Sequence, residues 1–269
     1  MTAFLNHFAF EFKTGLRNAT LLMMNYLFPL GVYVLLGLVM TPINPLFKDT
    51  MLPAMVAFVA MASPLLGLPS PLVEAREAGI YRTYKINGVP ALSILVIPVL
   101  TTILHTLIAS AIVAATAAPL FGAKLPANWT SFVLIALLTA VTFGALGALI
   151  GVVSANSRAT VLWSQLVFLP SMVIGGLMLP LSMLPKPVFT ISTLLPSARA
   201  MQAFAGLAYG QETALNPLVS VAVLLATAVL ALGLAIYLFN WDRVNQARRG
   251  HPLLALLVLL PSVAGIFLG

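Results

Sequence analysis

The residues whose types and spacing could do chemistry gather in one short run, EAREAGIYRTYKING, at residues 74–88. Only 7% of the chain is charged, yet this run places five charges within twelve positions: Glu74, Arg76, Glu77, Arg82 and Lys85. A charged side chain in the middle of a bilayer costs about 3 kcal/mol or more, so the run must lie outside the hydrocarbon. Charges around Tyr81 and Tyr84 favour docking into a groove on a soluble protein, because aromatic anchors dominate such contacts. The alternative is a solvated loop that only sets the topology.

A helical conformation would give this run a defined docking face. Residues three or four positions apart are neighbours on a helix surface, which groups Glu74, Ala78, Tyr81 and Lys85. Gly79 and Gly88 permit a break or a tight turn. We therefore predict a short helix within residues 74–88 that lies across the membrane surface.

His105, in the apolar run TTILHTLIAS, is the only ionisable residue well inside any of the expected spans. Thr101 and Thr102 lie one turn earlier, so the simplest interpretation is a neutral imidazole bonded to a hydroxyl or a backbone carbonyl. The alternative is a ligand-contacting or pH-sensing role, which would suit a secondary carrier driven by an ion gradient. Such carriers rely on intramembrane groups that change charge, and one histidine is a thin basis for that chemistry.

The sequence lacks the residue patterns that metal binding, catalysis, nucleotide binding or nucleic-acid binding would require. No histidines and carboxylates have metal-ligand spacing and the chain has no cysteine, so we expect no metal site. No nucleophile is paired with a base, so no catalytic residue is predicted. The GxxxxGK[ST] phosphate loop is absent, so energy for uphill transport must come from a partner. No basic stripe carries interleaved aromatics, which argues against nucleic acid as a partner. A membrane assembly or scaffold protein without transport is a further alternative.

The elements that must position these residues are membrane helices. The chain is 61% apolar, whereas soluble domains are about 45–50% apolar. A helix needs about twenty apolar residues to cross a ~30 Å hydrocarbon core. This length predicts six spans, at residues 19–40, 51–73, 89–120, 129–153, 159–183 and 216–239. The fold expected is an all-α membrane protein with a six-helix transmembrane domain over residues 19–239.

Four further segments flank or interrupt the spans. Residues 1–18 are amphipathic and predict an interfacial helix, with an apolar arc of Phe4, Leu5, Phe8, Phe12 and Leu16. Residues 184–215 are too long for a turn, and their apolar pieces predict short helices that re-enter the outer leaflet. Residues 240–251 form a basic segment, and residues 252–269 an apolar tail. As an α-helix the tail would reach about 27 Å, which makes a seventh crossing marginal.

The distribution of positive charge predicts the orientation. With the N-terminus inside, nine basic residues face the cytoplasm: Lys13, Arg17, Arg76, Arg82, Lys85, Arg158, Arg243, Arg248 and Arg249. The outside then holds four: Lys48, Lys124, Lys186 and Arg199. Because Lys and Arg resist translocation, the N-terminus and residues 74–88 are expected in the cytoplasm. Glu11, Lys13 and Arg17 argue against a cleaved signal peptide.

Small residues mark one face of the fourth span. Gly147 and Gly151 form a GxxxG motif, and Gly144 lies one turn earlier. Such residues let helices approach closely. Close packing within one chain is the favoured use, and a dimer interface is the alternative.

These motifs together resemble the transmembrane permease subunits of type-2 ABC exporters, the ABC-2 family. The resemblance covers most of residues 1–245. It rests on the amphipathic N-terminus, the E-x-R-E-x-G of residues 74–79 and the very short loop that holds Arg158. Its most specific part is a fifth span ending in SMVIGGLMLPLSMLP, followed by LLPSARAM in a long outer segment. The apolar tail departs from the usual six-span plan.

The resemblance implies a complex of two permeases, identical or different, with two soluble ABC ATPase subunits. ATP and Mg²⁺ would bind to the ATPase, and this chain would hold no cofactor. Residues 74–88 would be the coupling helix, and residues 154–158 would form a smaller contact. The residues assigned to docking are Glu74, Arg76, Glu77, Gly79, Tyr81, Arg82 and Arg158.

The resemblance also implies a location and a cargo. The protein would lie in the cell membrane among lipids as a multi-pass exporter subunit. Residues 188–206 would cap the export path, and His105, Gly175 and Gly176 are the candidates for lining it. Spans without charged groups fit a hydrophobic or amphipathic cargo, such as a drug, a lipid or a lipid-linked compound.

Overall fold

The computed structural model describes residues 2–44, 47–241 and 250–268, and every regular element within these ranges is helical. The expected all-α class is confirmed. The first half contains α1 (Thr2–Arg17), α2 (Ala19–Leu22), η1 (Met23–Leu27), α3 (Phe28–Ile43), α4 (Phe47–Gly67), α5 (Pro69–Glu77), α6 (Ile80–Ile86) and α7 (Ala91–Phe121). The second half contains α8 (Trp129–Val153), α9 (Ser157–Ile174), η2 (Leu181–Met183), α10 (Lys186–Ser192), α11 (Pro196–Ala203), η3 (Phe204–Ala208), α12 (Pro217–Leu238), η4 (Pro252–Leu259) and α13 (Leu260–Leu268).

Five helical stretches in the described residues are long and apolar enough to cross a membrane: Ala19–Ile43, Phe47–Glu77, Leu92–Phe121, Trp129–Val153 and Pro217–Leu238. The expected fifth span, residues 159–183, holds most of α9, a non-helical stretch at residues 175–180, and η2. α9 has 18 residues, and its helix ends before Gly175 although the apolar sequence continues. Gly176 has φ 84°, a conformation that favours glycine and turns the chain away from the helix axis. The count of six spans therefore stays a prediction.

α4 is the central helix of the bundle. It is apolar on all sides, and nearly all of its residues are buried. It packs against α3, α7, α8 and α9, because a helix without a polar face is stable only when it is surrounded.

α8 lies between α4 and α12, and its glycines make the contact with α4 and α5 close. A Cβ at Gly147 would come within 2.4 Å of the carbonyl oxygen of Pro64. One at Gly151 would come within 3.2 Å of the carbonyl oxygen of Pro69, and one at Gly144 within 3.3 Å of Ile103. All three glycines therefore face helices of the same chain.

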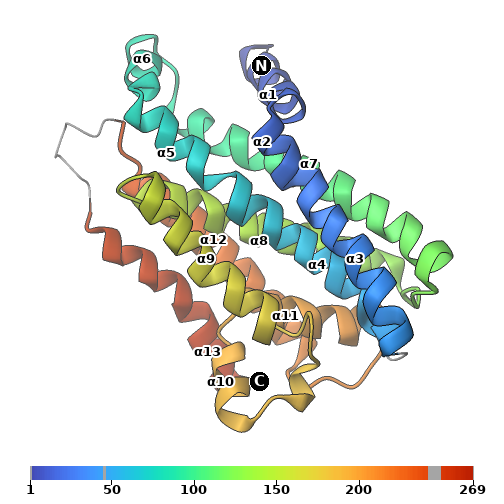
Figure 1. The fold of residues 1–269 in the computed structure, drawn as a ribbon. Coiled ribbons are helices and arrows are strands. Elements are labelled where there is room, and N and C mark those ends of the chain that lie inside the picture. Colours follow the sequence, from blue (N-terminus) through green and yellow to red (C-terminus); the bar gives the residue numbers. More distant parts are fainter. Residues whose placement is uncertain (1, 45–46, 242–249, 269) are drawn as a thin grey trace.

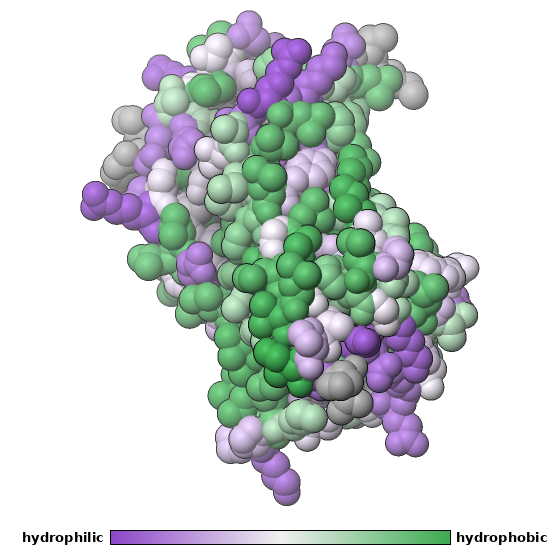
Figure 2. Space-filling view, turned by 45° about the vertical axis from the view of Figure 1, so that its right-hand side comes forward, coloured by the Kyte–Doolittle hydropathy of each residue, from purple (hydrophilic) through white to green (hydrophobic). Residues whose placement is uncertain are grey.

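The two ends of the bundle differ in character. One end, called here the α6 end, carries α1, α5 and α6, and α10 lies at the opposite end (Figure 1). On the face shown in Figure 2, an apolar band separates ends that carry hydrophilic residues. This pattern suits a chain that crosses a bilayer.

α1 packs against α7 at the α6 end. Its inward face includes His7, Glu11 and Gly15, with Phe12 stacked on His105 at a ring distance of 4.4 Å. The apolar arc expected to lie among acyl chains is thus divided, since Phe8 and Phe12 turn partly inward while Phe4, Leu5 and Leu16 are exposed.

Residues 184–215 contain α10, α11 and η3 at the end opposite α6. Every residue of α11 is buried, including Arg199 at 0% exposure. α11 packs against α12, α8, α4 and α9. Short helices are thus present where they were expected, and their depth in a membrane stays a prediction.

The apolar tail lies alongside α12. Gly250 contacts Tyr237 and Leu238 at one end of α12, and Gly265 contacts Val223 nearer the other end. The first eight residues of the tail form a 3₁₀-helix and the next nine an α-helix, which together reach roughly 30 Å. The expected basic segment, residues 240–251, includes Arg243, Arg248 and Arg249, which lie outside the described residues.

Candidate functional site

Gly79 is a hinge between α5 and α6. α5 ends at Glu77 and α6 begins at Ile80, with Gly79 at φ 72° between them. Because side chains disfavour this left-handed conformation, glycine is the residue suited to the position. The run 74–88 is therefore not one helix. It comprises the end of a long helix and a separate helix of seven residues.

The residues assigned to docking divide into two groups. Glu74, Glu77, Arg82 and Arg158 are exposed at the α6 end. Tyr81 is only 5% exposed, and its ring lies 5.6 Å from that of Phe239 at the end of α12. Tyr81 was expected to contact a partner and instead anchors α6 within the chain, because the end of α12 covers it.

A second contact holds α6 against the end of α12. The Lys85 ammonium lies 6.0 Å from the centre of the Trp241 ring, at the limit of a cation–π contact. Burial raises the pKa of the Tyr81 hydroxyl above its ordinary value. Both contacts place α6 beside the end of α12.

Arg76 also has an internal role. Its Nη1 donates a hydrogen bond of 2.8 Å to the carbonyl oxygen of Val152, and Nη2 donates to that of Ser154. The hydroxyl of Ser157 lies 3.5 Å from Oε2 of Glu77. The structure thus brings together residues 74–79 and 154–158, the two segments that the sequence assigned separately to one partner.

Two apolar residues on the same surface were missed by sequence reasoning. Ile80 is 42% exposed and Ile86 is 78% exposed, beside the charged residues of α6. Exposed apolar side chains ringed by charge are typical of a protein contact. The signal in the sequence was an isoleucine at each end of an otherwise polar run.

A second feature is an apolar groove between α3, α4 and α9, of about 660 Å³. Phe28, Phe58 and Phe168 form its wall, with ring centres 5.9 to 6.4 Å apart. Four methionines also line it: Met24, Met55, Met172 and Met178. Methionine side chains are flexible and polarisable, so such a surface adapts to differently shaped apolar molecules.

The three residues expected to line a transport path do not meet. Leu177 and Met178, directly after Gly175 and Gly176, line the groove. A Cβ at Gly175 would collide with Ser197 of α11. His105 instead faces α1 and η1, where its Nδ1 is 2.7 Å from the hydroxyl of Tyr26. Sequence reasoning had considered a hydroxyl partner for His105, but the partner comes from a distant helix.

Comparison with known proteins adds one match. A model of the family described as ABC-2 type transporter matches residues 2–209, which include all the residues assigned to docking and all those that line the groove. No curated protein and no solved structure matches the chain.

Proposed function

Because the chain belongs to the ABC-2 type transporter family, and so is a multi-pass permease subunit of an ABC transporter, we propose that it exports hydrophobic or amphipathic molecules with energy from a separate ATPase. The complex contains two permeases and two ATPase subunits in the cell membrane. The N-terminus and the α6 end face the cytoplasm. ATP and Mg²⁺ are bound by the ATPase.

The ATPase docks on the exposed surface of the α6 end. This docking surface comprises Glu74, Glu77, Arg82 and Arg158, with the exposed side chains of Ile80 and Ile86 among them. Charges of both signs select an ATPase surface with the complementary charges. The isoleucines provide apolar surface that a groove on the ATPase can bury. Tyr81 and Arg76 support this surface from behind.

The observation that carries the proposal is the link made by Arg76. It joins the end of α5 to the end of α8. α5 continues the central helix α4 after Leu68, so movement of the docking surface is transmitted to α4 and to the α8–α9 turn together. ATP-driven closure of the ATPases can therefore shift the bundle as a rigid unit.

The groove between α3, α4 and α9 is the proposed cargo path. Its volume of about 660 Å³ lies in the range of ligand sites, about 300–1,000 Å³. Its polar lining is limited to groups such as Ser164 and Gln165. Such a surface suits an apolar molecule or the apolar part of a lipid, and the second permease would close its open side.

The test is a double charge reversal on the docking surface. The Glu74→Lys, Glu77→Lys variant is co-expressed with an ABC ATPase from the same genome, and ATP hydrolysis is measured in liposomes. We expect hydrolysis to fall to that of the ATPase alone. The matched control, Asp49→Lys, Glu212→Lys, changes the net charge equally at exposed sites away from the α6 end and should leave hydrolysis unchanged. Full stimulation in the docking variant would contradict the proposal.

The ion-gradient carrier remains the alternative in which His105 is essential. Among the described residues His105 has no carboxylate partner, and it contacts two aromatic rings, one of which carries the hydroxyl it bonds, and the backbone of Phe12. Transport by the purified chain without nucleotide, lost in the His105→Gln variant, would favour the carrier over the exporter.

A further inference from the structure

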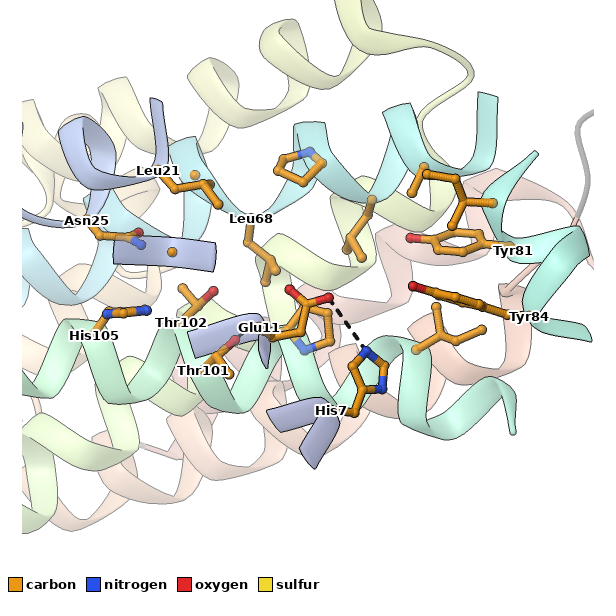
Figure 3. Close-up of a pocket in the computed structure, with 18 residues that line it drawn as sticks. His7, Glu11, Leu21, Asn25, Leu68, Tyr81, Tyr84, Thr101, Thr102 and His105 are labelled. Carbon is orange, nitrogen blue, oxygen red and sulfur yellow. Dashed lines mark hydrogen bonds and ion pairs between the residues drawn. The ribbon is translucent and has the colours of Figure 1, made fainter. Parts of the chain in front are cut away.

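A second cavity, of about 230 Å³, lies beneath α6 and is separate from the apolar groove. α1, η1, α5, α6 and α7 all contribute to its walls. Figure 3 shows its side chains extending from Tyr81 and Tyr84 at one end to His105 at the other. None of its lining residues belongs to the groove, and Ile80 is the one lining residue that it shares with the docking surface.

Glu11 places an acid midway along the cavity, between the tyrosines and His105 (Figure 3), while the positive charge of Arg76 also acts on Tyr81 from outside the lining. Glu11 is the only lining residue that is an acid, and none of the lining residues is Lys or Arg. Oε1 of Glu11 lies 3.6 Å from Nε2 of His7. The side chain of Glu11 is 29% exposed and that of His7 is 23% exposed. An imidazole is a full cation only when both of its nitrogens are protonated, so this partner does not permanently balance the carboxylate.

Two tyrosine rings lie on one side of the Glu11 carboxylate (Figure 3). Tyr81 is buried and Tyr84 half-buried, and the ring of Tyr84 lies 6.2 Å from that of His7 in an edge-on arrangement. In Figure 3 the two tyrosine hydroxyls point toward the side of the cavity where Glu11 lies. An ammonium group is attracted both to ring faces and to a carboxylate, and this pairing recurs where proteins bind choline or methylated lysine.

The inner end is polar but uncharged. Asn25, presented by the π-helical turn η1, is 4% exposed. Thr102 and His105 face it from α7. Nε2 of His105 is buried near Gly15, and besides the Tyr26 hydroxyl the ring interacts with the backbone of Phe12. A hydroxyl group on a bound molecule would find further hydrogen-bonding groups at this end of the cavity in Asn25 and Thr102.

We propose that this cavity binds a small organic ammonium ion, of the size of ethanolamine or choline, between Glu11 and the rings of Tyr81 and Tyr84. The ligand is either a free amine or the headgroup of a membrane lipid, because both carry the same group. It bridges α1 and the α5–α6 hinge, so binding restrains the position of α6. The proposal does not depend on the ATPase, since the site lies within one chain.

The first experiment measures binding of free amines. Choline and ethanolamine are titrated into the purified full-length chain in detergent, with glycerol 3-phosphate as the anionic comparison, and affinity is measured by calorimetry and thermal shift. We expect saturable binding of the amines and none of the anion. Glu11→Gln should weaken binding about tenfold or more, because it removes the counter-charge at nearly constant shape.

Variants of Tyr84 provide the matched control. Tyr84→Phe keeps the ring face and should bind within about threefold of the wild type, whereas Tyr84→Leu should lose about tenfold. Glu212→Gln removes an exposed carboxylate outside the cavity and the docking surface and should bind normally. This series remains decisive if Glu11→Gln fails to fold.

The second experiment tests whether the ligand is a free amine or the headgroup of a membrane lipid. The chain is placed in nanodiscs that contain phosphatidylethanolamine, phosphatidylcholine or phosphatidylglycerol, and retained lipid is measured by native mass spectrometry. Retention of the amine lipids, lost in Glu11→Gln, assigns the site to a headgroup. Binding of free amine without retained lipid assigns it to a soluble ligand. Equal binding by wild type and Glu11→Gln, equal binding of the anion, or no binding in either experiment overturns the proposal.

Discussion

Nη1 of Arg76, in the last turn of α5, lies 2.8 Å from the carbonyl oxygen of Val152, in the last turn of α8. The last four carbonyls of a helix have no partner within the helix. Arg76 supplies donors to the end of α8 and brings a positive charge to the negative end of its dipole. One side chain thereby joins two helices that end at the same surface.

Loss of this link should destabilise the α6 end. We expect Arg76→Ala to lower the free energy of unfolding by about 1.5–3 kcal/mol, the usual range for hydrogen bonds from a charged donor. Arg76→Lys should recover part of this loss, because an ammonium cannot match the two-pronged geometry. Thermal unfolding in detergent measures the effect. Arg82→Ala, at an exposed position of α6, is the control and should change stability by less than about 0.5 kcal/mol.

The contact between α8 and α4 is too close to accommodate one added methyl group without loss of stability. In Gly147→Ala the new Cβ would lie 2.4 Å from the carbonyl oxygen of Pro64, a main-chain atom that cannot rotate away. We expect a loss of about 1–3 kcal/mol, as for other overpacked cores. Gly233→Ala in α12 has no atom within 4 Å of its Cβ and should be neutral or stabilising. Equal stability of the two variants, measured by thermal unfolding, would contradict the packing described.

Removal of the buried charge in α11 should stabilise the chain. Arg199 is fully buried, and only its Nε has a hydrogen-bond partner in the described residues, the carbonyl oxygen of Thr193 at 3.1 Å. Burial lowers the pKa of the Arg199 guanidinium, since the charged form is disfavoured away from water. We expect Arg199→Met to gain about 1–3 kcal/mol, while Arg199→Ala gains less because it leaves a void. A clear loss in Arg199→Met would mean that a further group binds the guanidinium.

The apolar tail should place the two ends of the chain on opposite sides of the membrane. Pro252–Leu268 runs alongside α12, and its 3₁₀ segment extends its reach to roughly the ~30 Å of a hydrocarbon core. The chain has no cysteine, so Phe4→Cys and Leu268→Cys can each be labelled selectively in intact cells with an impermeant maleimide. We expect label at position 268 only. Labelling of both positions from one side would exclude a seventh crossing.

Span boundaries could be predicted where the helix ends carry local signals. The predicted span at residues 129–153 coincides with α8, whose first turn is capped by Asn128 through a 3.0 Å bond from the amide of Ser131. Asn216 and Pro217 likewise begin α12 one residue after the predicted start. Residues 159–183 differ because hydropathy does not report backbone conformation. Gly175 and Gly176 end α9 while the sequence remains apolar.

The candidate site was only partly predictable. The charges of Glu74, Glu77 and Arg82 are exposed, as the cost of burying them requires. The positions of Tyr81 and Arg76 could not be predicted, because their partners, Phe239 and Val152, are distant in the sequence. The same holds for the cavity, since Glu11, Tyr84 and His105 come from three helices.

The sequence by itself determined that this is a helical membrane protein with one strongly charged turn. Both properties follow from the transfer free energy of each side chain, which depends on the residue and its near neighbours. Only the tertiary structure decided that Tyr81 and Arg199 are buried and that Glu11 shares a cavity beneath α6 with Tyr81 and Tyr84. These depend on which helix faces meet, and packing between distant segments sets those faces.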